Sequence, residues 1–245
     1  MTNEPKIGLV TVLYNSIEVL EDFFQSLVNQ SYKNFILYVI DNSPNDDVLN
    51  EAIRLSNKFN INSVFINNNA NLGVAKGNNQ GIEQSLKDNC EYVLLLNNDI
   101  EFAQDTIKDL VEYTVKNDVS IIVPKIHYHN TNKIWTAGGH ISKLKGTSPH
   151  RGELEEDVGQ YENIEYVNYA PTCFMIIKKE VFEKVGLKDE KYFVYYDDSD
   201  FIYRTNENGY KIYADCPRCD NKISNFKNTQ KIEAIIIDNV QRDLF

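Results

Sequence analysis

The sequence predicts an α/β fold built on a mostly parallel central sheet. In the first half of the chain, short apolar runs typical of strands alternate with longer segments whose apolar residues recur at helical spacing. Strands that alternate with helices of this length form βαβ units, in which the strands run parallel. Polar clusters follow these apolar runs, and in such sheets ligands bind beyond the carboxyl ends of the strands. The pattern therefore places a candidate binding site at one rim of the sheet.

The first half of the chain supplies these units in order. Strands are expected over residues 7–13, 36–40, 63–66 and 92–96, because these runs are continuously apolar and rich in β-branched residues. Helices are expected over residues 17–28, 46–59, 74–86 and 105–115. The turn-rich cluster at residues 41–45 closes the second strand.

The second half is less regular, since its apolar stretches are broken by glycines and polar loops. Strands are expected over residues 121–128, 134–141 and 167–177, and helices over residues 178–185 and 199–208, the latter ending at Gly209. Near the end, over residues 231–244, Ile232, Ile235, Ile236 and Val240 fall near one helical face. A C-terminal helix packed on the core is the preferred interpretation, and docking on a partner or a membrane surface is the alternative.

Bulk properties exclude some classes of protein. The 245 residues are 42% hydrophobic and carry a net charge of -11. A nucleic-acid binder needs a basic face, so that class is excluded, whereas one small diphosphate needs only a local cation. The sequence has no run of about 18 apolar residues, which a spanning helix requires. Residues 1–6 are polar and lack the apolar segment of a signal peptide, so a cytoplasmic location is expected.

A predicted buried strand that ends abruptly in polar side chains is the first candidate site. Residues 92–96 are followed directly by Asn97, Asn98 and Asp99. Asp99 would project from the rim as a hard oxygen ligand, with Asn97 able to assist. One or two such groups, together with substrate phosphates, are the usual way in which proteins hold Mg²⁺ or Mn²⁺. The alternative is a turn that caps a helix, because turns favour the same residue types.

Three carboxylates within four positions form the second candidate site. Asp197, Asp198 and Asp200 directly follow two tyrosines. Such crowding is costly in a packed region unless the groups are solvated, protonated or neutralised by a cation. One of these carboxylates would suit a general base that takes a proton from a hydroxyl group. The alternative is an N-cap at the start of a helix, and the two interpretations are compatible.

Glycines and amide side chains crowd the third candidate site, a strand-to-helix junction at residues 67–81. Glycines let a ligand approach the backbone closely, and a helix N-terminus favours an anion. Lys76 would add positive charge. The glycine spacing matches neither the dinucleotide-binding fingerprint nor the Walker loop, so neither dinucleotides nor P-loop chemistry is indicated.

Together these segments resemble the inverting glycosyltransferases of family 2, especially the rhamnosyltransferase-like group that builds bacterial surface polysaccharides. The matching segments are residues 10–15, 39–43, 71–81, 95–99, and 174–182 running on to 196–201. The resemblance covers residues 7–213, and it depends on the order and spacing of these short segments rather than on any one of them.

The resemblance implies a GT-A fold in a single domain over residues 1–245. Residues 1–99 would form the nucleotide-binding half and residues 100–245 the acceptor half. A sugar would pass with inversion from a UDP- or TDP-sugar to a saccharide or glycolipid acceptor, with Mg²⁺ or Mn²⁺ as cofactor. The enzyme would work in the cytoplasm, with peripheral contact at the inner face of the cell membrane as an alternative.

The resemblance also assigns roles to residues. Asp198 is the implied catalytic base, and Asp99 and Asn97 occupy the position of the metal motif. Residues implied to bind the nucleotide-sugar are Thr11, Tyr14, Asn15, Asp41, Asn71, Gly73, Asn78 and Asn98. Residues implied to lie near the acceptor are Trp135, Gly138, Gly139 and Asp197, and Asp197 would face either the diphosphate or a structural partner.

The chain departs from the family pattern at two positions. Asn97 stands where an aspartate is common, and Asn221 stands where a histidine often precedes a Lys-Ile-Ser-like stretch. Both changes lower the expected affinity for metal. They also keep open a non-catalytic relative that binds nucleotide without turnover. A nucleotidyltransferase is a third hypothesis, but residues 14–18 lack the glycine- and lysine/arginine-rich loop that such chemistry uses.

Overall fold

A mostly parallel sheet forms the centre of the molecule, as the alternation of apolar patterns predicts. The computed structural model describes residues 4–215 and 234–236. Its eight-stranded sheet has the order β3-β2-β1-β4-β10-β6-β11-β9, in which β10 and β9 run antiparallel to their neighbours. These strands are β1 (Ile7–Leu13), β2 (Phe35–Asp41), β3 (Ser63–Asn67), β4 (Tyr92–Leu96), β6 (Ile121–Pro124), β9 (Glu165–Val167), β10 (Phe174–Lys178) and β11 (Ile212–Asp215).

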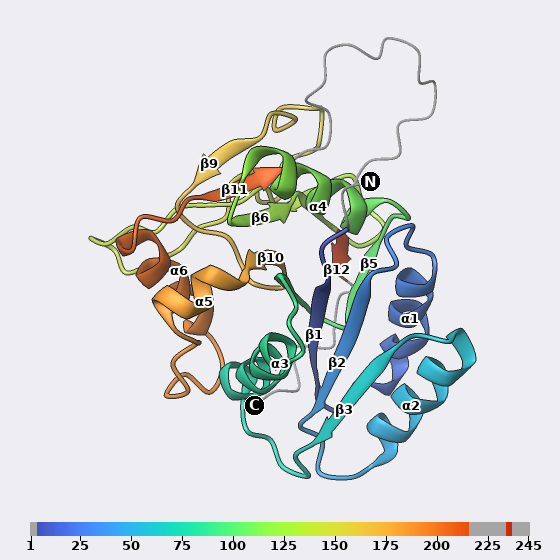
Figure 1. Ribbon diagram of the computed structural model, residues 1–245. Coiled ribbons are helices and arrows are strands. Elements are labelled where there is room, and N and C mark those ends of the chain that lie inside the picture. Colours follow the sequence, from blue (N-terminus) through green and yellow to red (C-terminus); the bar gives the residue numbers. More distant parts are fainter. Residues whose placement is uncertain (1–3, 216–233, 237–245) are drawn as a thin grey trace.

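Helices cover both faces of this sheet (Figure 1). A short 3-10 turn, η1 (Ile17–Val19), leads into α1 (Leu20–Val28), which packs on one face with α2 (Asp47–Phe59) and α4 (Thr106–Asn117). The other face carries α3 (Val74–Lys87), α5 (Lys179–Val185) and α6 (Asp197–Glu207). Each helix buries one apolar stripe against the sheet, which gives two cores in a layered arrangement. Each helix of the described residues is too short or too polar to span a bilayer.

The order of the parallel strands creates a switch point at the carboxyl ends of β1 and β4. From β1 the chain builds outward through β2 to β3, and it then crosses back to place β4 on the opposite side of β1. In open α/β sheets such a reversal leaves a crevice outside the strand ends, where ligands bind. The polar segments that follow β1 and β4 therefore meet at the rim predicted for the site.

A second, four-stranded sheet corrects the prediction for the C-terminal segment. Its order is β5-β12-β7-β8, with β5 at Ile100–Phe102, β7 at Ile126–Tyr128, β8 at Ile134–Thr136 and β12 at Ala234–Ile236. The helix expected over residues 231–244 is wrong for residues 234–236, which form a strand between β5 and β7. Ile232 and Val240 lie outside the described residues. The apolar run is rich in isoleucine, a residue that suits a strand when backbone partners are available.

The remaining corrections concern boundaries in the second half. The expected strand over 121–128 is two strands, β6 and β7, which belong to different sheets and meet at Lys125. Of residues 134–141, only Ile134–Thr136 is a strand, and residues 167–177 contain a loop between β9 and β10. Helix α6 begins two residues earlier than expected and ends before Gly209, whose φ of +84° fits the predicted helix stop.

Close packing of α3 on β1 leads to a first prediction. A Cβ atom at Gly8 would lie 2.6 Å from Ser85 Cβ and would overlap the Ser85 hydroxyl. We expect Gly8→Ala to lower the free energy of unfolding by about 1–3 kcal/mol, the usual cost of overpacking a core. Chemical denaturation measures this loss. Ser85→Gly in the same chain should recover most of it, and a double variant as unstable as Gly8→Ala would show that this contact is not the cause.

Candidate functional site

The rim of the sheet is held together by hydrogen bonds between the ends of different strands. The Asn15 backbone N–H donates to Ser43 Oγ at 3.0 Å, which joins the segments after β1 and β2. Asn42 Nδ2 donates to the Gly73 carbonyl at 3.1 Å and so reaches the start of α3. Three elements, β1, β2 and α3, are thus tied into one rim, and Asn15, Asp41 and Gly73 of the predicted donor set belong to it.

Two predicted nucleotide-binding residues on this rim contain buried polar atoms that lack a partner. Thr11 on β1 and Asp41 at the end of β2 are fully buried. Asp41 Oδ1 accepts a hydrogen bond from the Ser43 backbone N–H at 2.9 Å. Thr11 Oγ1 and Asp41 Oδ2 have no hydrogen-bond partner among the described residues. Since buried polar groups are normally paired, these atoms are candidates to contact a ligand.

The start of α3 is shaped by Gly73. This residue has a φ of +83°, and a Cβ atom there would lie 2.5 Å from the Phe193 carbonyl oxygen. Asn71 Oδ1 accepts from the Gly73 backbone N–H at 3.1 Å, and the Val74 N–H donates to the Phe193 carbonyl at 2.8 Å. The predicted donor loop therefore packs directly against the segment that leads into α6. The Asn78 side chain is buried and donates to the Val74 carbonyl of its own helix.

The segment after β4 carries the candidate metal ligands. Asn98 is buried and donates to Ser16 Oγ at 2.6 Å, which ties this segment to the one after β1. Asp99 is 4% exposed, and its Oδ1 has no hydrogen-bond partner among the described residues. Burial raises the pKa of Asp99 to about 6, although hydrogen bonds from its own backbone and from Asn97 act in the opposite direction.

These features are compatible with a divalent cation held mainly by Asp99. An unpartnered buried carboxylate oxygen is a suitable ligand for a hard cation, and half-buried Asn97 adds a second oxygen. No cluster of three or more His, Cys, Asp or Glu side chains arranged to hold a metal occurs in the described part of the chain. A cation here would therefore depend on substrate phosphates for much of its coordination.

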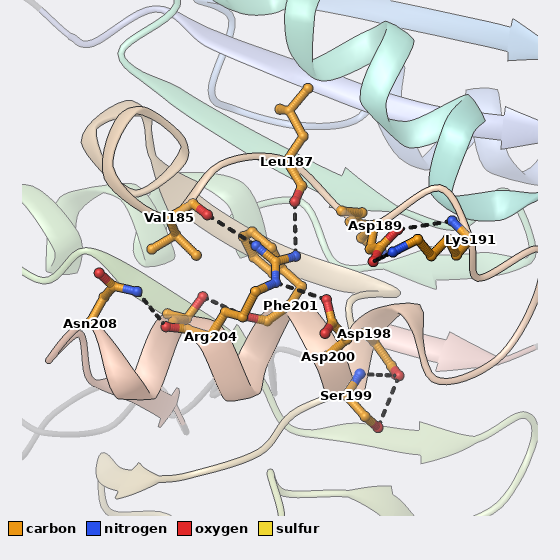
Figure 2. A network of polar contacts seen from close by, with 12 residues as sticks. Val185, Leu187, Asp189, Lys191, Asp198, Ser199, Asp200, Phe201, Arg204 and Asn208 are labelled. Atoms are coloured by element: carbon orange, nitrogen blue, oxygen red, sulfur yellow. Dashed lines mark hydrogen bonds and ion pairs between the residues drawn. The ribbon is translucent and has the colours of Figure 1, made fainter.

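The three carboxylates at the start of α6 have different partners. Asp197 Oδ2 accepts from Lys188 Nζ at 2.7 Å, and the Lys188 side chain is fully buried. Asp200 pairs at 2.8 Å with Arg204, whose guanidinium also donates to the carbonyls of Val185 and Leu187 (Figure 2). Asp197 was expected to face either the diphosphate or a structural partner, and Lys188 is such a partner. Two of the three charges are neutralised by cations.

Asp198 instead has neutral hydrogen-bond donors. Its Oδ1 accepts from the Ser199 backbone N–H at 2.6 Å and from the Ser199 hydroxyl at 3.3 Å (Figure 2). Its Oδ2 accepts from the Tyr169 hydroxyl at 2.9 Å. The side chain is half-buried. Within the described residues, Asp198 is therefore the one carboxylate of the three that is not paired with a cation.

The backbone before α6 is strained. Tyr195 and Tyr196 have φ values of +62° and +58°, in the left-handed region that bulky residues rarely adopt. Both side chains are exposed. Backbone outliers of this kind persist where the surrounding structure holds them, and they cluster at functional sites. The strained turn delivers Asp197 and Asp198 to the same end of the molecule as the donor loop, which contacts Phe193 nearby.

Cys173 links the two candidate sites. This buried thiol precedes β10, and its backbone carbonyl accepts from the Asn97 N–H at 2.8 Å. Burial raises the pKa of Cys173 well above its usual range, and the nearby carboxylates of Asp99 and Asp198 add to this effect. The Asn97 hydrogen bond places the segment after β4 against Cys173, and the charge of Asp198 acts on the same thiol.

Two of the residues expected near the acceptor are connected to Asp198 by ring contacts and backbone bridges. The Trp135 ring meets the His150 ring edge-on, with ring centroids 4.6 Å apart, and His150 stacks on Tyr169 at 6.0 Å. Gly139 forms isolated bridges with both His150 and Tyr169. Gly138 is buried, and a Cβ atom there would lie 2.7 Å from Val167 Cγ1. Trp135 and Gly139 thus connect to Asp198 through Tyr169.

Several residues of the site were not found from the sequence. Ser16, His150, Tyr169 and Lys188 contact predicted site residues, yet each lies far from its partner in the sequence or outside any motif. Ser16 and Asn98 are 82 positions apart, and Tyr169 and Asp198 are 29 apart. No local signal marks Lys188 as buried, because it opens a run of charged residues at positions 188–191.

Two named glycosyltransferases are similar in sequence to part of this chain. The low-salt glycan biosynthesis hexosyltransferase Agl10 of Haloferax volcanii is 32% identical over 152 residues, which cover 60% of this chain and 48% of that protein. The dTDP-rhamnosyl transferase RfbF of Shigella flexneri is 24% identical over 215 residues, covering 84% of this chain and 65% of the relative. The chain thus spans about half to two thirds of these relatives.

Solved structures with the same fold are known. The mannosyltransferase PcManGT of Pyrobaculum calidifontis, solved with GDP-Man and Mn²⁺, superposes with a TM-score of 0.67 at 14% identity and covers 98% of this chain and 59% of that protein. S. aureus TarS 1-349, solved with UDP, gives a TM-score of 0.64 at 14% identity and covers 94% and 60%. At this identity the likeness shows the fold, which is the predicted GT-A arrangement.

A family model supplies the assignment of the chain. The model described as glycosyl transferase family 2 matches residues 9–186, which include the rim segments, the candidate metal ligands and the acceptor-side glycines. The resemblance inferred from short segments is confirmed over most of its length. The protein belongs to glycosyl transferase family 2.

Proposed function

We propose that the protein transfers a sugar from a nucleotide-sugar donor to an acceptor hydroxyl with inversion at the anomeric carbon. The observation that carries this proposal is the contrast between two carboxyl groups, Asp99 after β4 and Asp198 at the start of α6. Within the described residues, Asp99 has an unpartnered buried oxygen suited to a cation, and the hydrogen bonds to Asp198 come from neutral donors. Inversion requires the hydroxyl to attack on the face opposite the leaving diphosphate, so a base and a phosphate-binding group must border the same space.

Asp198 is the proposed general base. It would take the proton of the acceptor hydroxyl as the new glycosidic bond forms, since an ionised carboxylate can accept a proton. Asp99 and Asn97 would hold Mg²⁺ or Mn²⁺ together with the diphosphate of the donor. A cation bound there would stabilise the charge that develops on the leaving diphosphate.

The donor nucleotide would lie along the rim formed by the ends of β1, β2 and β4. The donor loop at Asn71 and Gly73 would border the diphosphate, where the helix N-terminus favours an anion. Thr11, Tyr14 and Asp41 would contact the nucleoside. A UDP- or TDP-linked sugar is proposed, which agrees with the UDP and dTDP named for two of the relatives. The acceptor would be a saccharide or glycolipid of a bacterial surface polysaccharide or glycoconjugate, reached at the inner face of the cell membrane.

Calorimetry with nucleoside diphosphates tests the donor site. We expect UDP or TDP to bind in the presence of Mn²⁺, because the site offers both a cation ligand and a helix N-terminus to the diphosphate. GDP serves as the control, since a structural relative was solved with GDP-Man. Binding of GDP alone would reject the pyrimidine assignment and keep the site. Failure of all three nucleotides to bind would contradict the proposal.

A non-catalytic relative is the second candidate, and Asn97 at the metal position is the observation that favours it. Transfer assays separate the two candidates. Nucleotide binding without transfer or donor hydrolysis, over a panel of UDP- and TDP-sugars with saccharide acceptors, would support the non-catalytic protein. Product with inverted configuration, identified by NMR of the new linkage, would support the transferase.

A further inference from the structure

The hydroxyl of Tyr169 is hydrogen-bonded to the proposed base, Asp198. Tyr169 lies in the loop between β9 and β10, is 5% exposed, and donates to Asp198 Oδ2 at 2.9 Å. Burial, followed by the Asp198 charge, raises the pKa of Tyr169 above its usual range. The phenol therefore keeps its proton at any ordinary pH, and it always acts toward Asp198 as a donor.

The Tyr169 ring is fixed by its surroundings. His150 stacks on it with 24° between the ring planes, and the Trp135 ring meets the His150 ring edge-on at 82°. His150 Nδ1 is 3.2 Å from the Trp135 carbonyl oxygen. The Gly139 backbone bridges to both His150 and Tyr169. A hydroxyl on a ring held in this way fixes the direction from which Asp198 receives its hydrogen bond.

Among the described groups around Asp198, Tyr169 is the hydrogen-bond donor that comes from outside α6. On α6 itself, Asp197 is paired with Lys188, Asp200 is paired with Arg204, and Ser199 donates to Oδ1. The Ser199 hydroxyl in turn lies 3.1 Å from that of Ser148. From the β10 side, Cys173 is a protonated thiol on which the charges of both Asp99 and Asp198 act. Among the described residues, the hydrogen bonds to Asp198 come from Ser199 and Tyr169.

We propose that Tyr169 is a positioning residue that holds the Asp198 carboxylate ionised and aimed at the acceptor hydroxyl. This inference rests on the proposed role of Asp198 as the base. A hydrogen bond to the charged form of a carboxyl group favours that form, and bonds to ionised groups are about twice as strong as neutral ones. With Oδ2 anchored by the phenol and Oδ1 by Ser199, the carboxylate keeps one orientation, and its remaining lone pairs are available for the proton.

Tyr169→Phe removes this hydroxyl and keeps the ring that stacks on His150. We expect the acidic limb of the pH profile of kcat to move to higher pH by about one unit. The direction follows because the ionised carboxylate loses a donor, so a higher pH is needed to keep the base unprotonated. On the acidic limb, below the pKa of the base, kcat should fall by up to about tenfold, and it should approach the wild-type value at higher pH. The donor KM should not change.

Tyr161→Phe is the matched control, because the Tyr161 hydroxyl bonds to the Glu155 carboxylate at 3.0 Å away from the proposed base. It should leave the pH profile unchanged. A Tyr169→Phe enzyme with a wild-type profile would overturn the inference, and so would an equal loss of kcat at every pH with a lowered Tm, which indicates a structural role only. Asp198→Asn is assayed in parallel. If it is inactive in either of these cases, the proposed function survives, whereas full activity of Asp198→Asn would remove the basis of both.

Discussion

Replacing Asp198 by asparagine is expected to lower the rate of sugar transfer by a factor of about a hundred to ten thousand, the usual cost of removing a general base. The amide has the shape of the carboxylate. Its oxygen can still accept from the Ser199 backbone N–H while its NH2 group donates to the Tyr169 hydroxyl oxygen, so fold and donor binding should be kept. The loss should therefore appear in kcat and not in nucleotide affinity. Steady-state transfer assays, with nucleotide titrations and melting temperatures on the same preparations, measure the three quantities.

The neighbouring carboxylates provide matched controls for this substitution. Asp200→Asn weakens a half-buried ion pair with Arg204 and should mainly lower stability. Asp197→Asn leaves the Lys188 ammonium buried without its anion and should lower stability further. Neither change removes the group proposed to take the proton. Near-normal turnover in Asp198→Asn, with a folded but inactive Asp197→Asn or Asp200→Asn enzyme, would move the base to that neighbour.

The first half of the fold was predictable because its local patterns and its tertiary contacts agree. The strand at Tyr92–Leu96 is apolar throughout and is buried throughout, and the amphipathic stripe of α2 packs on the sheet as its spacing requires. In the second half, Pro124 and Lys125 interrupt the stretch from Ile121 to Tyr128, and its two parts enter different sheets. A proline inside a predicted strand is a signal of such a division, and the single-strand prediction did not use it.

The C-terminal segment shows a limit of local sequence patterns. Ile235 and Ile236 fit a helical face by spacing, and they are also good strand residues. The outcome depends on β5 and β7, whose free edges accept Ala234–Ile236 between them. Those strands lie more than a hundred positions earlier in the chain. Pairing at such a separation leaves no trace in a local pattern, so a periodicity argument chose the wrong element.

The residues of the candidate site that lie at strand ends could be predicted from the sequence. The side chains that approach them from other loops could not. Asp41, Gly73 and Asp99 could be named because strand-to-helix junctions in parallel sheets gather at one rim. The difference between Asp197 and Asp198 could not be derived from three adjacent carboxylates. It arises from Lys188 and Tyr169, which approach from separate loops. Sequence spacing identifies which residues share a turn, and packing decides which of them has a cation beside it.

Asp99→Ala is expected to abolish the increase in nucleotide affinity that Mn²⁺ or Mg²⁺ produces. In the wild type this increase should be on the order of tenfold, a modest value because one carboxylate and one amide provide little charge for a hard cation. The variant should bind UDP or TDP with the same weak affinity in Mn²⁺ and in EDTA. Burial raises the pKa of Asp99 to about 6, and a cation competes with protons for the ionised carboxylate. The wild-type increase should therefore shrink as the pH is lowered from 7.5 to 5.

Two further variants separate the metal ligand from general effects of charge and burial. Asp109→Ala removes another carboxyl group whose pKa burial raises to about 6. Asp109 lies on α4, which packs on the opposite face of the sheet from α6. It should leave the metal effect intact. Asn97→Asp adds a second carboxylate beside Asp99 and should strengthen the metal effect, because a hard cation gains a charged oxygen. A metal effect that persists in Asp99→Ala would reject Asp99 as the ligand. Loss of the effect there together with its increase in Asn97→Asp would locate the cation at the end of β4, at the switch point of the sheet where ligands of such folds bind.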